Sequence, residues 1–129
     1  MKQLVLIFSL IALINCEKME DSSSFKDEYQ REICDKYSLY ANTMDVEGSM
    51  SLYAENAIVN GNGRAPVQGA EQIRKDFIEW YSSSESINHS AKVIAAHVSG
   101  NKAFAYGKRK VDRTSKRGQR TTRECQWST

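Results

Sequence analysis

The stretch INHSAKVIAAHVSGNKAFAYGKRKVD, residues 87–112, decides the fold. Residues 87–98 alternate in polarity and predict one long strand. Ser99-Gly100-Asn101 predicts a tight turn, so that residues 102–112 run back as an antiparallel partner. Strict alternation would place these side chains on one face of the first strand: Ile87, His89, Ala91, Val93, Ala95 and His97.

The sequence on either side completes an α+β pattern. A second turn at residues 115–118 is followed by a third alternating segment, 119–128. Upstream, apolar residues recur at helical spacing, which predicts amphipathic helices with one short strand between them. Helices gathered on one face of an antiparallel sheet define an α+β domain. The predicted upstream elements are helices at 25–44, 46–53 and 70–81, a strand at 57–60 and a loop from Pro66 to Gly69.

The first 16 residues predict export. Leu4 to Ile14 is an apolar run of eleven residues after Lys2, too short to anchor a protein across a bilayer but suited to a signal segment. Leu13-Ile14-Asn15-Cys16 resembles the lipobox of bacterial lipoproteins, which implies lipidation of Cys16 and a membrane-anchored protein of the cell envelope. Asn15 departs from that pattern, so an ordinary secretory signal, giving a soluble periplasmic or secreted protein, stays open. Residues 17–24 are predicted to be a polar tether, and residues 25–129 a single domain.

The charge is divided unevenly along the chain. The formal net charge is +2, but residues 17–106 carry −5 and residues 108–125 carry +6. The basic segment is interpreted as solvated edge strands whose charges discourage edge pairing, with contact to anionic lipid head groups as the alternative. Export and the lack of aromatic residues interleaved with the charges argue against nucleic acid.

Three motifs resemble the superfamily of nuclear transport factor 2, which includes ketosteroid isomerases and SnoaL-type cyclases. The motifs are Asp45 to Val59, Gly69-Ala70-Glu71-Gln72-Ile73-Arg74, and Asn101-Lys102-Ala103-Phe104-Ala105-Tyr106-Gly107. The resemblance implies a cone: a curved antiparallel sheet packed against the N-terminal helices around a cavity. It also suggests a homodimer through the sheet. The family closes its sheet with a further strand, but here the sequence stops at Trp127-Ser128-Thr129, so that strand is expected to be missing or cut off.

The resemblance also bears on catalysis. In the isomerase branch the general base is an aspartate at the end of the first strand, and Asn60-Gly61 stands there in this sequence. An amide cannot accept the proton, so a binding or interaction domain without catalysis is predicted. The alternative is a small-molecule isomerase, lyase or hydrolase that uses His89 or His97 as a lone acid or base.

The predicted site is a cavity for a small apolar ligand, with no cofactor. His89 and His97 would lie about 26 Å apart on an extended strand and could not share a metal ion, so no metal site is predicted. Cys34 and Cys125 are interpreted as unpaired thiols, with a disulfide as the alternative. The residues predicted to line the cavity are Tyr37, Tyr53, Asn60, Trp80, Tyr106 and Trp127.

Overall fold

The structure, a computed structural model, describes residues 22–61 and 63–129. The predicted signal segment, its Cys16 and residues 17–21 of the predicted tether lie outside the described residues. No helix within the described ranges is both long enough and apolar enough to cross a bilayer.

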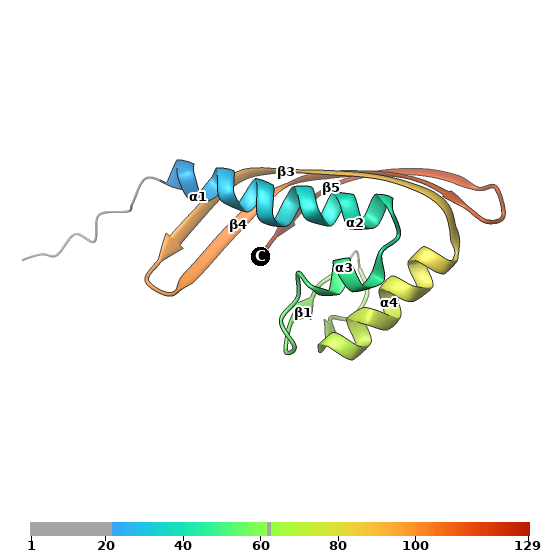
Figure 1. Cartoon of the computed structure of the whole chain (residues 1–129), viewed down its shortest axis with the longest axis horizontal. Coiled ribbons are helices and arrows are strands. Elements are labelled where there is room, and N and C mark those ends of the chain that lie inside the picture. The colour runs from blue at the N-terminus through green and yellow to red at the C-terminus, as the bar shows by residue number, and fades with distance from the viewer. Residues whose placement is uncertain (1–21, 62) are drawn as a thin grey trace, which may run out of the picture.

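A nearly continuous helical rod confirms the long helix predicted from the apolar spacing. It consists of α1 (Ser22–Tyr29), the π-helical segment η1 (Gln30–Asp35) and α2 (Lys36–Asn42). The rod begins at Ser22, inside the predicted tether. It lies along the sheet (Figure 1) and packs against the first long strand.

The next segment folds back beneath the rod. The helix α3 (Val46–Met50) is capped by Asp45, whose carboxylate accepts a hydrogen bond from Gly48 N at 2.9 Å. It is followed by β1 (Ile58–Val59), β2 (Val67–Gln68) and α4 (Ala70–Ser82). The pairing of β1 with β2 corrects the prediction of a loop between Pro66 and Gly69. Two residues between a proline and a glycine carry no strand periodicity, so only the tertiary pairing reveals β2.

Three long antiparallel strands form the main sheet and confirm the predicted meander. They are β3 (Ser84–Ser99), β4 (Lys102–Ser115) and β5 (Arg120–Ser128), in the order β3-β4-β5. The β3–β4 turn places Gly100 at φ 58°, a conformation that glycine adopts without the Cβ clash of other residues.

A β-bulge at Ile94 separates the two histidines of β3. Val93 pairs with Gly107, whereas Ala95 pairs with Tyr106, so β3 holds one extra residue. His89 therefore faces the helices, while His97 pairs with Phe104 on the other side and is exposed. The prediction that both histidines share a face is wrong, because alternation in one strand does not reveal an unpaired residue.

Gly107 sits at a close approach next to the bulge. A Cβ built there would lie 2.0 Å from Lys92 O and 2.6 Å from the ring of Trp127. Trp127, the β5 partner of Gly107, thus occupies the space over this position. A glycine is required because both neighbours are too close for any side chain.

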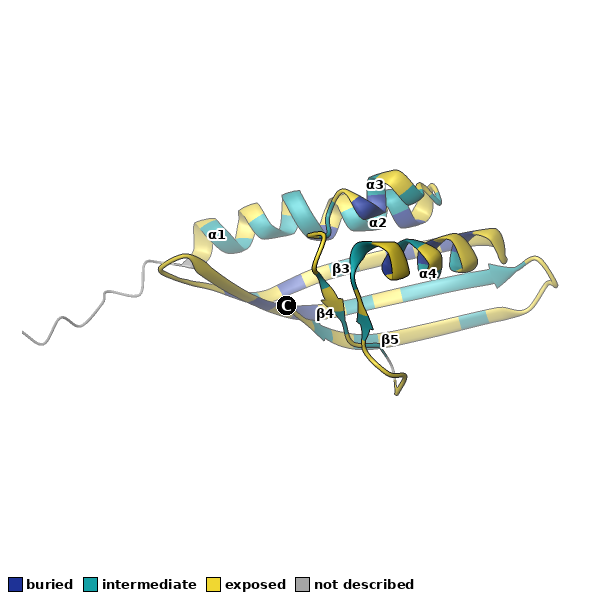
Figure 2. Ribbon diagram, turned by 90° about the horizontal axis from the view of Figure 1, so that it is seen from below, coloured by how far each residue is buried: buried dark blue, intermediate teal, exposed yellow. Residues whose placement is uncertain are grey.

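The core is divided into two clusters of buried side chains. One, between α2–α4 and β3, is centred on Phe77, Tyr81 and Ile87. The other, between the N-terminal part of the rod and the sheet, contains Cys34 and Val93. Figure 2 shows that burial fades toward the exposed β3–β4 hairpin.

Two amide side chains of the rod cover the free edge of β3. Asn42 Nδ2 donates to His89 O at 3.2 Å, and His89 N donates to Asn42 Oδ1 at 2.6 Å. Gln30 makes a similar pair of bonds further along β3, with two residues: its Nε2 donates to Ala91 O at 3.0 Å and its Oε1 accepts from Val93 N at 2.8 Å. These four bonds satisfy backbone groups that an edge strand would otherwise expose.

Candidate functional site

A cavity of about 760 Å³ lies between the rod, the β1 segment and the sheet. Five of the six residues predicted to line it do so, and His89 lines it as well: Tyr37, Tyr53, Asn60, Tyr106 and Trp127. Trp80 lies elsewhere and packs against Phe77 and Tyr81. The exposed His97 does not line the cavity. Whether these residues contact a ligand stays a prediction.

Most of the cavity wall is aromatic or aliphatic. Tyr29 and Trp127 stack with ring centroids 5.8 Å apart and an interplanar angle of 13°. Ile33, Leu52 and Val59 add aliphatic surface. Such a wall favours the burial of an apolar ligand body.

Asn60 lines the cavity directly after β1. This is the position where the family resemblance expects the base of an isomerase. The structure therefore puts an amide, not a carboxylate, at that part of the wall.

His89 is the most constrained polar group in the cavity wall. Its residue is 3% exposed, and its Nδ1 lies 2.9 Å from Ser38 Oγ. The hydroxyl proton of Ser38 is donated to Cys34 O at 2.9 Å, so Ser38 Oγ must accept from Nδ1–H. The proton of the neutral ring is thereby assigned to Nδ1, and Nε2 carries a lone pair. Nε2 is buried without a hydrogen-bond partner among the described residues.

The surroundings of His89 keep its ring uncharged. Burial, followed by the positive charge of Arg109, lowers the pKa of His89 to about 4. The ring of Tyr37 lies with its centroid 4.9 Å from that of His89. Near neutral pH, His89 is therefore a neutral hydrogen-bond acceptor through Nε2.

Two tyrosines bring hydroxyl groups to the same region. Burial is the main cause that raises the pKa of both Tyr37 and Tyr53. The interaction between their hydroxyls raises the pKa of Tyr37 further and partly offsets the effect of burial on the pKa of Tyr53. Both phenols are thus protonated near neutral pH and able to donate hydrogen bonds.

Arg109 completes the polar cluster, although in the sequence it stands out only as one member of the basic segment. It lies on the inner face of β4, paired with Ala91 and Cys125, and its Nε donates to Cys125 Sγ at 2.9 Å. Burial alone would lower the pKa of Arg109, but the contacts with Cys125, Tyr37 and Tyr53 raise it, so the guanidinium is charged. Alternation along β4 was the available signal, because it sets Arg109 opposite to Lys108 and Lys110.

The two cysteines of the described part are free thiols. Burial, with a smaller contribution from Asp35, raises the pKa of Cys34 to about 11, so this thiol is protonated and unreactive near neutral pH. In residues 22–61 and 63–129, no group of three or more His, Cys, Asp or Glu side chains is placed to hold a metal ion.

Neither protein-family models nor curated proteins match the sequence, but solved structures match the fold. A proposed aromatic ring hydroxylase from Novosphingobium aromaticivorans is 17% identical, with a TM-score of 0.67 over 84% of this chain and 78% of that one. A proposed dehydratase of the nuclear transport factor 2-like family from Streptomyces avermitilis is 13% identical, with a TM-score of 0.63 over 81% and 84%. A protein of unknown function from Exiguobacterium, also nuclear transport factor 2-like, is 15% identical, with a TM-score of 0.59 over 71% and 80%.

These likenesses define the class of fold. The chain folds as a nuclear transport factor 2-like cone, with N-terminal helices packed on a curved antiparallel sheet. Members of this fold class differ in what they do, so the function has to be argued from the cavity itself.

Proposed function

We propose that this domain binds a small molecule with an apolar, ring-containing body in the cavity between the helices and the sheet. The observation that carries the proposal is the cavity of about 760 Å³, whose wall combines aromatic and aliphatic residues with a polar cluster. The cluster consists of Tyr37, Tyr53, His89 and Arg109. This size and this division of polarity are typical of small-molecule sites, in which few polar groups fix the orientation of a largely apolar ligand.

Titration with the neutral fluorescent probe N-phenyl-1-naphthylamine tests this proposal. Ala91→Phe fills part of the cavity and should weaken binding about tenfold. The neighbouring Ser90→Phe points to the outer face of the sheet and should leave the affinity unchanged. Failure of the probe to bind, or equal effects of the two substitutions, would refute binding in the cavity.

Catalysis by His89 is the second candidate function, and the assigned ring tautomer favours it. A neutral imidazole with a lone pair on Nε2 is the form that a general base requires. A proposed dehydratase among the structural neighbours agrees with an elimination reaction. Against this candidate, the residues that line the cavity include no Asp or Glu side chain to orient a catalytic histidine.

Any ligand that binds can be used to separate the two candidates. Incubation of the bound ligand with the native protein and with His89→Asn, followed by mass spectrometry, should show the ligand unchanged with both proteins if the domain only binds. Turnover by the native protein that His89→Asn abolishes, with binding retained, would establish catalysis instead.

We further propose that the domain acts outside the cytoplasm, held at the cell envelope by a lipid on Cys16. The support is the sequence of residues 1–16, with its apolar run and lipobox-like end. Mass spectrometry of protein purified from membranes should show a diacylglyceryl group on Cys16, and Cys16→Ser should release the protein from the membrane fraction. An unmodified cysteine in a membrane-free protein would refute the anchor.

A further inference from the structure

The cavity wall contains one charged side chain among its described residues, Arg109. The other ionisable side chains of the wall are tyrosines, Cys34 and His89. Burial shifts the pKa of Cys34, Tyr37, Tyr53 and His89 in the direction that keeps each of them neutral near pH 7. Among the side chains that line the cavity, positive charge is therefore found at one point, Arg109.

The charge of Arg109 has no carboxylate partner in the described part of the chain. None of the ion pairs there includes Arg109, and its one hydrogen bond goes from Nε to the sulfur of Cys125. A half-buried guanidinium with five donors is thus bound by one weak acceptor. Burying a charge without a partner is unfavourable, and a bound anion would remove that cost.

Arg113, four residues further along β4 on the same face, is an arginine whose donors are bonded within the protein. Its Nε donates to Ser84 Oγ at 2.6 Å, and its Nη2 donates to Ser83 O at 3.0 Å and to Ser83 Oγ at 2.8 Å. Arg113 is held against the end of α4 and does not line the cavity. The contrast indicates that Arg109 is left with donors for a ligand.

The groups around Arg109 add further donors. The hydroxyls of Tyr37 and Tyr53 are protonated and close enough for Arg109 to influence the pKa of both. Phenol and guanidinium donors together suit an oxyanion, because charge-assisted hydrogen bonds from arginine to carboxylate are among the strongest in proteins. A cationic ligand would meet repulsion from Arg109 and no carboxylate side chain in the wall.

We propose that the cavity takes a small organic anion whose ring body lies on the aromatic and aliphatic wall and whose carboxylate binds Arg109. This rests on the proposed function and narrows it to a class of ligand. The Nη donors of Arg109 bind the carboxylate, and the phenol of Tyr53 or Tyr37 gives a second hydrogen bond. Tyr29 and Trp127 stack beside the ring body.

Three probes of one shape test the charge preference directly. 2-Naphthoate, 2-naphthamide and 2-naphthamidine share a two-ring body and a planar head group, and they differ in charge from negative through neutral to positive. Calorimetry near pH 7 should show 2-naphthoate bound at least about tenfold more tightly than 2-naphthamide, with 2-naphthamidine weakest. This comparison uses the native protein alone and does not depend on the folding of any variant.

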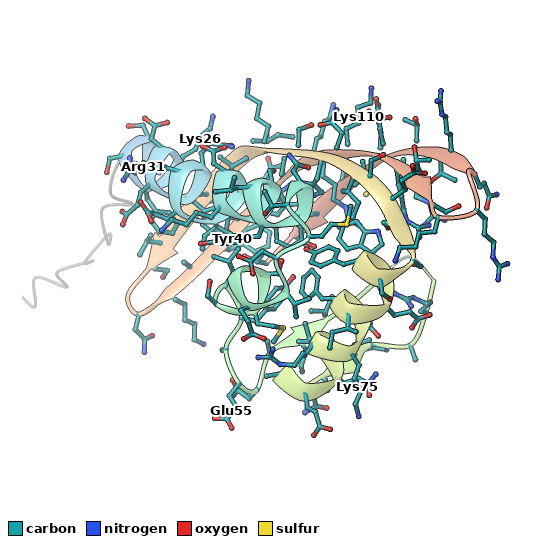
Figure 3. All side chains as sticks on the ribbon, turned by 45° about the vertical axis from the view of Figure 1, so that its right-hand side comes forward. Lys26, Arg31, Tyr40, Glu55, Lys75 and Lys110 are labelled. Atoms are coloured by element: carbon teal, nitrogen blue, oxygen red, sulfur yellow. The ribbon has the colours of Figure 1, made fainter. Side chains whose placement is uncertain are left out.

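Substitutions then assign the preference to one residue. Arg109→Gln should weaken 2-naphthoate at least about tenfold and change the affinity for 2-naphthamide by less than about twofold, while Arg109→Lys should keep part of the preference. Lys110→Gln is the matched control, since Lys110 is the next residue of the strand and projects from the outer face (Figure 3). It should leave all three affinities unchanged.

The outcomes separate the inference from the proposed function. Equal binding of 2-naphthoate and 2-naphthamide by the native protein, or equal weakening of both by Arg109→Gln, would overturn the anion site and leave a neutral ligand site standing. Loss of the preference in Lys110→Gln would also overturn it, because the charge effect would then come from the outer face. Absence of binding of all three probes, together with that of N-phenyl-1-naphthylamine, would overturn both.

Discussion

The two parts of β3 on either side of its bulge differ in almost every respect. Residues 84–93 carry the buried Ile87, His89 and Val93, and α2 and η1 cover their inner face and edge. In residues 94–99, Ile94, His97 and Val98 are exposed, and only Ala96 is buried, in the cluster under α1. The sequence of residues 94–99 is apolar on both faces, so it does not show which side chains are buried; the inserted residue turns Ala96 inward and His97 outward.

The comparison shows how a histidine becomes a candidate site residue. His89 and His97 are equivalent in the sequence pattern, yet His89 has a buried ring, a fixed tautomer and a lowered pKa, whereas His97 is exposed. Burial under the helices, rather than the residue type, creates these properties. The predictions below test the conditions that keep the two parts different.

The largest effect should come from Gly107, which forms with Val93 the last regular pair before the bulge. Gly107→Val places side-chain atoms against Lys92 O and the Trp127 ring and should lower the free energy of unfolding by about 4 kcal/mol. Ala103→Val, at an exposed position of the same strand, should change it by less than about 0.5 kcal/mol. Denaturant titration measures both, and a loss below about 1 kcal/mol for Gly107→Val would mean that the sheet does not close tightly here.

The pH dependence of stability should distinguish the two histidines. The folded state lowers the pKa of His89 to about 4 from an ordinary value near 6.5, so the unfolded chain binds the proton more tightly. The contribution of His89 is present above about pH 6.5, falls as the pH drops and is fully lost below about pH 4. The difference amounts to about 3 kcal/mol.

Unfolding free energies near pH 7 and pH 4 should show this in paired variants. His89→Asn should remove about 3 kcal/mol of the pH dependence, whereas His97→Asn should retain it. Carboxylates that titrate in the same range are common to all three proteins and cancel in the comparison. Identical pH profiles for native protein and His89→Asn would contradict a buried neutral His89.

A smaller effect is expected from Ser38, the hydrogen-bond partner of His89. Ser38→Ala leaves Nδ1–H of His89 buried without its acceptor and should cost about 2 kcal/mol. Ser90→Ala, on the exposed outer face next to His89, should cost less than about 0.5 kcal/mol. Equal losses in the two variants, measured by denaturant titration, would argue against the assigned tautomer.

The smallest effect is expected beyond the bulge. Phe104 is 48% exposed and pairs with His97, and its ring lies 6.1 Å from that of Tyr106. Phe104→Ser should change the unfolding free energy of the monomer by less than about 0.5 kcal/mol. Sedimentation velocity of the two proteins also tests the predicted homodimer through the sheet: a dimer that Phe104→Ser dissociates would support it, and a native monomer would contradict it.

The sequence predicts the order of elements well because each has a strong periodic signal. The helical rod, α4 and the three long strands all follow from apolar spacing, and the turn glycines mark their ends. The six predicted lining residues are all aromatic or follow β1, and five of them line the cavity. Trp80 packs against Phe77 and Tyr81 instead, and the sequence does not separate these cases because a tryptophan at helical spacing fits the core and a cavity wall equally.

The remaining features depend on contacts that a one-dimensional pattern does not contain. The bulge at Ile94 decides which histidine faces inward, and Ser38 decides the tautomer of that histidine. Arg109 looks like any other member of a basic segment until the register of β4 places it in the cavity. Each of these depends on the side chain of another element, which only the folded chain brings near.

The amide clasp formed by Gln30 and Asn42 on the edge of β3 has a consequence for hydrogen exchange. The backbone N–H groups of His89 and Val93 are bonded to side-chain oxygens of the rod, not to a neighbouring strand. These two protons can exchange with solvent only when the rod lifts from the sheet, which also uncovers the cavity. Their exchange rates therefore measure how often the cavity opens. Slower exchange in the presence of a ligand would report binding without a fluorescent label.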